Sequence, residues 1–391
     1  MSIIVLYIVV VHSVGFLRVP CCTLDEGYFW PTSLFFSEKP IPSIDDLRSY
    51  NELNTPLAFI IYGQLEYWFG QGIVAGRLLN LVLSITMVLI IGWPTREKDG
   101  RELFCVLGLF LCPYYLWLSG WIYTEMIACV WMLMGLVGYV RKRYLWSSLA
   151  FVFAIATRQY MLAFPAAIAT YEFISVVIET RQSSRINWQA QWRWFLPFIA
   201  ACSILGWFYL FQGLAPENSY IVRQPPEVQT TAWGMDLGGA IHYLSFIGTY
   251  IVIPEFLLFS PGTKLRSLRE EWGQQKYRVA IIALGLLIFM LIFPPQEMAG
   301  GIIIRVVRLL PHSALQFGFY YSLSLLTCLR FSRLTLVTFL VFFNAAIMTK
   351  AYPWDRYVLP MVVAFWYLKS IGVADQLTLS LQVLNLKRIF S

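Results

Sequence analysis

The chain is built from apolar runs that recur from one end to the other, each long enough or nearly long enough to cross a lipid bilayer. A membrane-spanning helix needs roughly 20 apolar residues to cover about 30 Å of hydrocarbon. The hydrophobic share is 58%, above the roughly 45–50% of soluble domains. We therefore expect an all-α polytopic transmembrane bundle in which residues 1–391 form a single domain. Hydropathy predicts about twelve spans, near residues 3–18, 75–94, 103–118, 124–140, 145–157, 161–178, 194–212, 239–260, 279–293, 309–328, 334–349 and 358–374.

The Lys and Arg residues divide the connecting segments into two faces. Nineteen of the 29 cations lie in alternate connections such as 96–101, 141–143 and 264–278. The positive-inside rule makes that face cytoplasmic, so both termini are predicted to be cytoplasmic. The membrane would be the plasma membrane or the endoplasmic reticulum. Because the net charge of +7 is scattered between apolar runs, it does not indicate a nucleic-acid partner.

The longest connections, 19–74 and 213–238, fall on the non-cytoplasmic face. Loops longer than about 15 residues are usually functional or disordered, and these contain aromatic residues and proline rather than low-complexity sequence. Within the first of them, residues 54–70 are apolar at helical spacing and end at Gly70. This pattern favours a helix that lies in the membrane interface. Chemistry is therefore expected in these outer loops and in a shorter one at 294–308.

An acidic pair, Asp25 and Glu26, follows closely on the first predicted span and is flanked by Tyr28, Phe29 and Trp30. Poor solvation at a membrane surface walled by aromatic rings can raise the pKa of a carboxyl group, which then serves as a base near neutral pH. The alternative is a solvated carboxylate beside an aromatic belt.

A third carboxylate, Glu125, stands where a short outer turn meets a predicted span. Ionisable residues at this depth usually face a bundle interior or a wet cavity and have a function. The competing interpretation is that Thr124 and Glu125 only cap the helix, where the dipole favours a carboxylate.

Several cations are expected on the same face as these carboxylates. Arg158 lies in the turn between two apolar segments, and Arg356 follows Asp355 near the C-terminus. Arg305 and Arg308 lie one helical turn apart and could equally reach lipid headgroups. For Asp355 and Arg356 the alternative is a local surface pair that contributes little. A base and fixed cations are what transfer of a group from a lipid phosphate requires, because the cations stabilise the departing phosphate.

The order of these motifs resembles the GT-C superfamily of polyprenyl-phosphate-sugar glycosyltransferases. The resemblance rests on Asp25-Glu26, the Thr55-Pro56-Leu57 stretch ending in Phe69-Gly70, the Gly76-Arg77-Leu78-Leu79-Asn80 motif, and Asp355-Arg356-Tyr357-Val358-Leu359-Pro360. Within the superfamily, Tyr123-Thr124-Glu125 and Thr157-Arg158-Gln159 are most similar to the dolichyl-phosphate-glucose-dependent α-1,2-glucosyltransferase family.

The resemblance implies that Asp25 is the catalytic base, with Glu26 and Glu125 as orienting or acceptor-binding groups. The substrate-binding residues it implies are Arg158, Gln159, Arg356, Asp355, Arg77 and Tyr123. The donor is expected to be a polyprenyl-phosphate hexose, either glucose or mannose, and the acceptor a glycan, lipid or protein. We predict no metal and no cofactor because the chain has no Asp-x-Asp motif, although a divalent cation stays open.

Two other functions fit the same pattern less well. A transporter or flippase for lipid-linked saccharides favours ionisable residues deep in the spans, and few are found beyond Glu172, His242 and Glu255. A polysaccharide polymerase or ligase also uses outer-face arginines, but it does not need an acidic pair directly after the first span.

Overall fold

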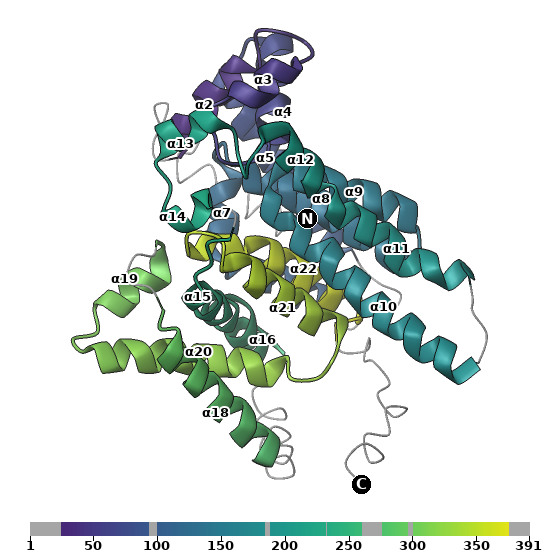
Figure 1. The fold of residues 1–391 in the computed structure, drawn as a ribbon, viewed down its shortest axis with the longest axis vertical. Coiled ribbons are helices and arrows are strands. Elements are labelled where there is room, and N and C mark those ends of the chain that lie inside the picture. Colours follow the sequence, from purple (N-terminus) through teal and green to yellow (C-terminus); the bar gives the residue numbers. More distant parts are fainter. Residues whose placement is uncertain are drawn as a thin grey trace.

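The fold is helical throughout the part of the chain that the computed structural model describes, residues 25–93, 100–183, 188–231, 233–259, 276–295 and 300–374 (Figure 1). One isolated β-bridge joins Gly300 to Trp354. The all-helical expectation is thus confirmed for these ranges. The predicted span 3–18 and the beginning of the first outer loop, 19–24, lie outside the described residues.

The helices follow the predicted apolar runs closely. The first half of the chain forms α2 (Glu26–Phe35), α3 (Ile44–Ser49), α4 (Leu57–Phe69), α5 (Ile73–Gly92), α6 (Arg101–Phe110), α7 (Pro113–Ser119), α8 (Thr124–Val140), α9 (Tyr144–Thr157) and α10 (Ala163–Ser183). The second half forms α11 (Trp188–Cys202), α12 (Ile204–Phe211), α13 (Glu217–Arg223), α14 (Glu227–Thr230), α15 (Gly238–Ile247), α16 (Ile253–Leu258), α18 (Lys276–Ile292), α19 (Ile302–Arg308), α20 (Ser313–Arg330), α21 (Leu336–Met348) and α22 (Leu359–Ser370).

Four helical stretches in the described ranges are long and apolar enough to cross a membrane, or five if the bent pair α6 and α7 counts as one. They are Ile73–Gly92, Gln159–Arg181, Ala190–Phe211 and Gly238–Leu258. The helices α8, α9 and α21 are apolar but have 17, 14 and 13 residues, fewer than the roughly 20 that a perpendicular span needs. The structure thus supports a multi-pass membrane protein, and twelve spans are not shown.

The segment 103–118, predicted as one span, is broken into α6 and α7, which meet at 74°. The break lies at Pro113, the first residue of α7. Proline lacks a backbone N–H, and it pushes the preceding residue away from the helical region. Cys112 accordingly has an extended backbone, with φ −86° and ψ 107°.

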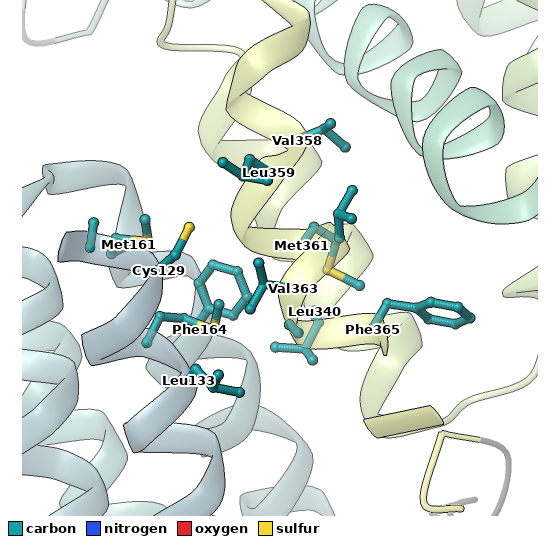
Figure 2. Packing of buried hydrophobic residues seen from close by; sticks show 14 of the residues in the cluster. Cys129, Leu133, Met161, Phe164, Leu340, Val358, Leu359, Met361, Val363 and Phe365 are labelled. Atoms are coloured by element: carbon teal, nitrogen blue, oxygen red, sulfur yellow. The ribbon is translucent and has the colours of Figure 1, made fainter. Parts of the chain in front are cut away.

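The helix α22 forms the centre of the bundle. Every residue from Leu359 to Ser370 is buried, which is typical of a core helix that is apolar on all sides. Figure 2 shows Val363 and Met361 of α22 facing Phe164 of α10 and Leu340 of α21. Helix α6 approaches α22 at Gly108, where an added Cβ would lie 2.3 Å from the ring of Trp366.

The described part of the predicted first outer loop folds into α2, α3 and α4 at one end of the molecule, where α13 lies beside them (Figure 1). The helix predicted within residues 54–70 is confirmed as α4, and it ends at Gly70, which has a left-handed backbone with φ 57°. Close packing of α4 against α2 needs Gly63, because a Cβ there would lie 2.6 Å from the carbonyl oxygen of Ser33. This packing positions Asp25, the residue that directly precedes α2.

Candidate functional site

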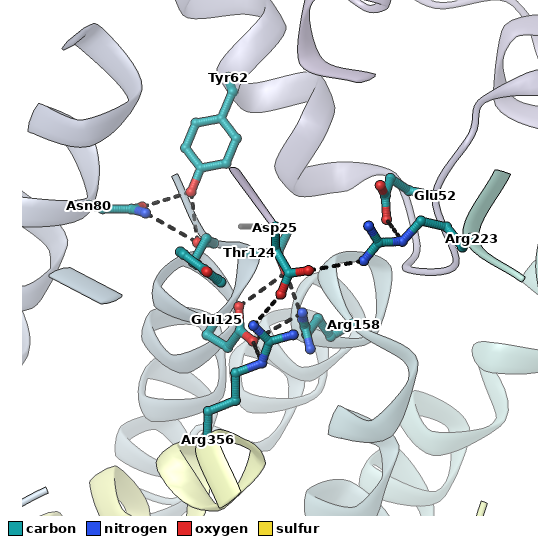
Figure 3. A network of polar contacts seen from close by, with 10 residues as sticks. Asp25, Glu52, Tyr62, Asn80, Thr124, Glu125, Arg158, Arg223 and Arg356 are labelled. Carbon is teal, nitrogen blue, oxygen red and sulfur yellow. Dashed lines mark hydrogen bonds and ion pairs between the residues drawn. The ribbon is translucent and has the colours of Figure 1, made fainter. Parts of the chain in front are cut away.

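Asp25 lies where α2 begins. Its carbonyl oxygen accepts hydrogen bonds from the backbone N–H groups of Tyr28 and Phe29, which start the helix. Its side chain contacts two arginines from distant parts of the chain. Arg223 Nη2 donates to Oδ1 at 3.2 Å, and Arg356 Nη1 donates to Oδ2 (Figure 3). Both carboxylate oxygens of Asp25 are therefore engaged by cations.

Glu125 is fully buried and belongs to the same network (Figure 3). Its Oε1 lies 3.0 Å from Arg158 Nη2 and 3.4 Å from Arg356 Nε. Arg158 Nε also donates to Thr124 Oγ1 at 2.6 Å. The residue that caps α8 is Tyr123, and it makes no side-chain capping bond. The interpretation of Thr124 and Glu125 as mere helix caps is therefore wrong: Thr124 binds an arginine, and Glu125 lies in an ion-pair network.

Aromatic rings surround Arg356 and Arg158. The guanidinium carbon of Arg356 lies 4.4 Å from the ring centre of Trp354, 5.3 Å from that of Tyr357 and 5.4 Å from that of Tyr123. Arg158 lies 5.5 Å from the same Tyr357 ring. Cation–π contacts are strongest where water is excluded, and they hold both guanidinium groups in fixed positions.

These arginines border a cavity of about 210 Å³, which we call the basic cavity. Its lining contains both cationic and apolar residues. The cations are Arg158, Arg223, Lys350 and Arg356. The apolar residues include Leu162, Phe208, Leu214, Ala215, Ile347 and Ala351. A cavity with this mixed lining suits a ligand that has an anionic group and a hydrocarbon chain.

Gln159 also lines the basic cavity and holds its walls together. Its Nε2 donates to the carbonyl oxygen of Leu53 at 2.5 Å and to that of Leu214 at 3.5 Å. Of the sequence-predicted residues, Arg158, Gln159 and Arg356 therefore meet at one cavity. Asp25, Glu125 and Tyr123 do not line this cavity, but each contacts Arg356, which does.

Glu26 and Arg77, by contrast, form an internal ion pair. Arg77 Nε donates to Oε1 of Glu26 at 3.0 Å, and Nη2 donates to Oε2 at 2.6 Å. The backbone N–H of Ile122 donates to the same Oε1 at 2.9 Å. Neither side chain lines the basic cavity. Although adjacent in sequence, Asp25 and Glu26 thus have separate surroundings, and Glu26 joins α2 to α5 and to the turn before α8.

Asp355 is also not among the residues that line the basic cavity. It is buried and accepts hydrogen bonds from the hydroxyl groups of Tyr114 and Tyr250 and from the N–H groups of Ile302 and Ile303. The interpretation of Asp355 and Arg356 as a surface pair is wrong, because both are buried and have different partners. Asp355 orients the start of α19, where Gly301 leaves room for it.

The pKa of Asp25 differs from the expectation. Burial raises it, but the charges and hydrogen bonds of Arg356 and Arg223 outweigh burial, so that the pKa lies below its ordinary value. The expectation that poor solvation makes Asp25 a base near neutral pH is therefore wrong for the resting site. Neighbouring cations, which the local sequence does not contain, decide the sign of the shift.

Three residues of the site were not predicted: Glu52, Arg223 and Lys350. Glu52 is 1% exposed, and its Oε2 lies 3.5 Å from Arg223 Nε. Burial raises the pKa of Glu52 to about 7. The sequence signals were general ones: Glu52 and Arg223 lie in the two long outer loops, and Arg223 and Lys350 belong to the minority of cations on the predicted outer face. Their convergence with Glu52 depends on tertiary packing.

Over the described ranges, no group of three or more His, Cys, Asp or Glu side chains is placed to hold a metal ion. Comparison of the chain with protein-family models, with curated proteins and with solved structures finds no significant match.

Proposed function

We propose that the chain is a membrane glycosyltransferase of the GT-C type, which transfers a hexose from a polyprenyl-phosphate sugar to a glycan, lipid or protein. The observation that carries this proposal is the lining of the basic cavity. It combines four cations with apolar side chains. A phosphate with a polyprenyl chain has the same two-part chemistry.

The arginines support a role in binding the donor phosphate. Guanidinium groups bind phosphate oxygens bidentately, and charge-assisted hydrogen bonds are roughly twice as strong as neutral ones. Fixed donors also stabilise negative charge that develops on a leaving group, because they need no reorganisation during the reaction. In this proposal Arg356 and Arg158 stabilise the phosphate as the sugar departs from it.

The proposal also needs a carboxylate that accepts the proton of the acceptor hydroxyl. The resemblance gives this role to Asp25. In the resting site both oxygens of Asp25 are engaged by Arg356 and Arg223. Asp25 would therefore accept a proton only after the donor phosphate has drawn at least one of these arginines away.

The membrane arrangement is part of the proposal: about twelve spans, both termini cytoplasmic and the site on the non-cytoplasmic face. Glu52, Arg158, Arg223, Lys350 and Arg356 all belong to connections assigned to that face by charge bias, and all line one cavity. Their convergence supports the sidedness. Single Cys residues introduced at positions 98 and 218 test it in sealed vesicles, where they should label from opposite sides.

The function is tested by incubating the purified protein with synthetic polyprenyl-phosphate glucose or mannose. The acceptors are glycolipids extracted from cells that lack this chain. We expect mass spectrometry to show one hexose added to one acceptor, with release of polyprenyl phosphate. Tight binding of the donors without any transfer, combined with their movement across proteoliposome membranes, would instead establish a carrier of lipid-linked sugars.

A further inference from the structure

Glu52 lines two cavities. It stands in the connection between α3 and α4 and lines the basic cavity. It also lines a cavity of about 410 Å³, which we call the polar cavity. The lining of the polar cavity includes Tyr28 and Thr32 of α2, Asn51 of the connection and Asn218 of α13. Glu52 is the only carboxylate among the described residues that line either cavity.

The two cavities differ in charge. Four cations border the basic cavity, whereas the described lining of the polar cavity contains neither Lys nor Arg. Its lining residues include Thr32, Asn51, Asn218 and Tyr28. The Thr32 hydroxyl group donates to the carbonyl oxygen of Tyr28, and the Asn218 amide group donates to that of Ser49. Hydroxyl and amide groups both donate and accept hydrogen bonds, as the hydroxyl groups of a sugar require. A phosphate is therefore favoured in the basic cavity, and a neutral saccharide in the polar one.

The carboxylate of Glu52 is less occupied by hydrogen bonds than that of Asp25, although its side chain is the more buried of the two, 2% against 15% exposed. Glu52 Oε2 is buried and has no hydrogen-bond partner, and its ion-pair contact is Arg223 Nε at 3.5 Å. Both oxygens of Asp25 accept hydrogen bonds from arginines. A buried polar atom without a hydrogen bond is costly, which makes it a candidate for contact with a ligand.

Charged and titratable groups face Glu52 from each neighbouring segment. Burial is the main cause that raises its pKa to about 7. Arg223 of α13 and Arg158 after α9 oppose that rise, whereas Asp25 before α2 adds to it. Tyr50, two residues away, is buried and has its own pKa raised, mainly by burial and also by Glu52. A carboxyl group with a pKa near the working pH is well suited to general base catalysis.

We propose that Glu52 accepts the proton of a hydroxyl group presented by an acceptor saccharide in the polar cavity, an inference that rests on the proposed glycosyl transfer. The acceptor oxygen forms a bond to the anomeric carbon of the hexose. The bond from that carbon to the phosphate oxygen breaks, and its electron pair leaves with the phosphate, beside Arg356. The proton of the acceptor hydroxyl moves to Glu52 Oε2 and is later released to water.

Asp25 is then a positioning residue. It holds Arg356 and Arg223 through its two oxygens, and these arginines line the basic cavity where the donor phosphate binds. Replacement of Asp25 by Asn should therefore affect donor binding, whereas replacement of Glu52 by Gln should affect proton transfer.

The test compares Glu52→Gln, Glu52→Asp and Asp25→Asn with the wild-type protein in the transfer assay, from pH 5.5 to 9. The probes are synthetic polyprenyl-phosphate glucose and mannose, with the glycolipids of deletion cells as acceptors. In the wild type, we expect kcat/KM to fall about tenfold per pH unit below about pH 7, as the base becomes protonated. Glu52→Gln should lower kcat by roughly 10²–10⁴-fold and remove this acid limb. Glu52→Asp should keep a weakened acid limb.

The outcomes separate this inference from the proposed function. If Glu52→Gln keeps wild-type kcat and an unchanged acid limb while Asp25→Asn loses both, Asp25 is the base and the inference is overturned, although the function stands. If the wild type neither binds nor uses any of the donors, the proposed function fails and the inference with it. Thermal unfolding of each variant shows whether a loss of activity reflects misfolding.

A second variant tests the acceptor site independently of proton transfer. Asn51 lines the polar cavity but not the basic one. Asn51→Ala should raise the KM for the acceptor several-fold and leave the KM for the donor unchanged. Equal KM values for the acceptor in this variant and in the wild type would contradict a saccharide site in the polar cavity.

Discussion

Arg356 donates a hydrogen bond to Asp25 across 331 positions of sequence, so that the start of α2 and the segment before α22 meet at one site. The same guanidinium group lies 3.4 Å from Glu125. Arg356 thus connects Asp25 and Glu125, two of the three carboxylates predicted to be functional. It also lines the basic cavity, where an anionic ligand could compete with Asp25 for it.

Replacement of Arg356 should therefore weaken binding and use of the donor more than those of the acceptor. A hydrogen bond to a charged group contributes about 1.5–3 kcal/mol, which corresponds to roughly 10- to 150-fold. We expect Arg356→Gln to lower kcat/KM for the donor by a factor in this range. The control variant Arg305→Gln removes the same charge from an exposed position on α19. It should change kcat/KM by less than about threefold. Similar losses in both variants, in a steady-state transfer assay, would argue against a specific role for Arg356.

Glu26 and Arg77 should matter for stability rather than for substrate binding. Both are almost completely buried, and the loss of one partner of a buried ion pair costs about 3–5 kcal/mol because it leaves an uncompensated charge. We expect Glu26→Gln and Arg77→Met to lower the thermal unfolding temperature of the purified protein strongly. The double variant should recover part of the loss. A normal unfolding temperature with a raised KM for the donor would instead place Arg77 in the substrate site.

Glu52 should make stability depend on pH. An unfolded glutamate ionises near pH 4.3, whereas the pKa of Glu52 in the folded protein is about 7. The folded protein therefore binds this proton more tightly. The resulting stability is fully present below about pH 4 and is lost as the pH rises through 7.

The Glu52→Gln variant keeps an uncharged side chain at every pH. Its free energy of unfolding, relative to that of the wild type, should therefore rise between pH 5 and pH 8. This rise should approach the order of 3 kcal/mol, since one pKa unit corresponds to 1.36 kcal/mol, and it should appear as a higher relative unfolding temperature. The exposed Glu217, in α13, supplies the matched control Glu217→Gln. A gain that does not change with pH would show that Glu52 is not protonated in the folded state.

The ion pair between Glu125 and Arg158 should behave as a unit. The two side chains are buried and 3.0 Å apart, and Arg158 also binds the adjacent Thr124. A double-mutant cycle with Glu125→Gln and Arg158→Gln should give a coupling energy of about 0.5–3 kcal/mol in denaturant unfolding. Additive effects on the free energy of unfolding would mean that Glu125 is stabilised mainly by Arg356 rather than by Arg158.

The helices were largely predictable because the apolar runs and their breaks are local features of the sequence. The start of α8 at Thr124 and the end of α4 at Gly70 were predicted, since an acidic turn and a glycine mark them. The bend at Pro113 was also a local signal, but the run 103–118 was interpreted by hydropathy alone. The number of spans was less predictable, because apolar helices as short as α9 are buried among their neighbours.

The site was predictable only in part. Arg158, Gln159 and Arg356 carry sequence motifs, and they line one cavity. Glu52 and Arg223 have no such motif, and a sequence separation of 171 positions conceals their contact. The local sequence also gave the wrong sign for the pKa of Asp25, because both compensating arginines come from elsewhere in the chain.

The proposed function requires that the basic cavity binds the phosphate of a polyprenyl carrier. The most direct test is the affinity of the purified protein for polyprenyl phosphate and for the uncharged polyprenol of equal length, measured for the wild type and for Arg356→Gln. The account predicts that the wild type binds the phosphate at least about tenfold more tightly than the polyprenol, and that Arg356→Gln loses this preference. Equal affinity of the wild type for the two lipids would contradict it.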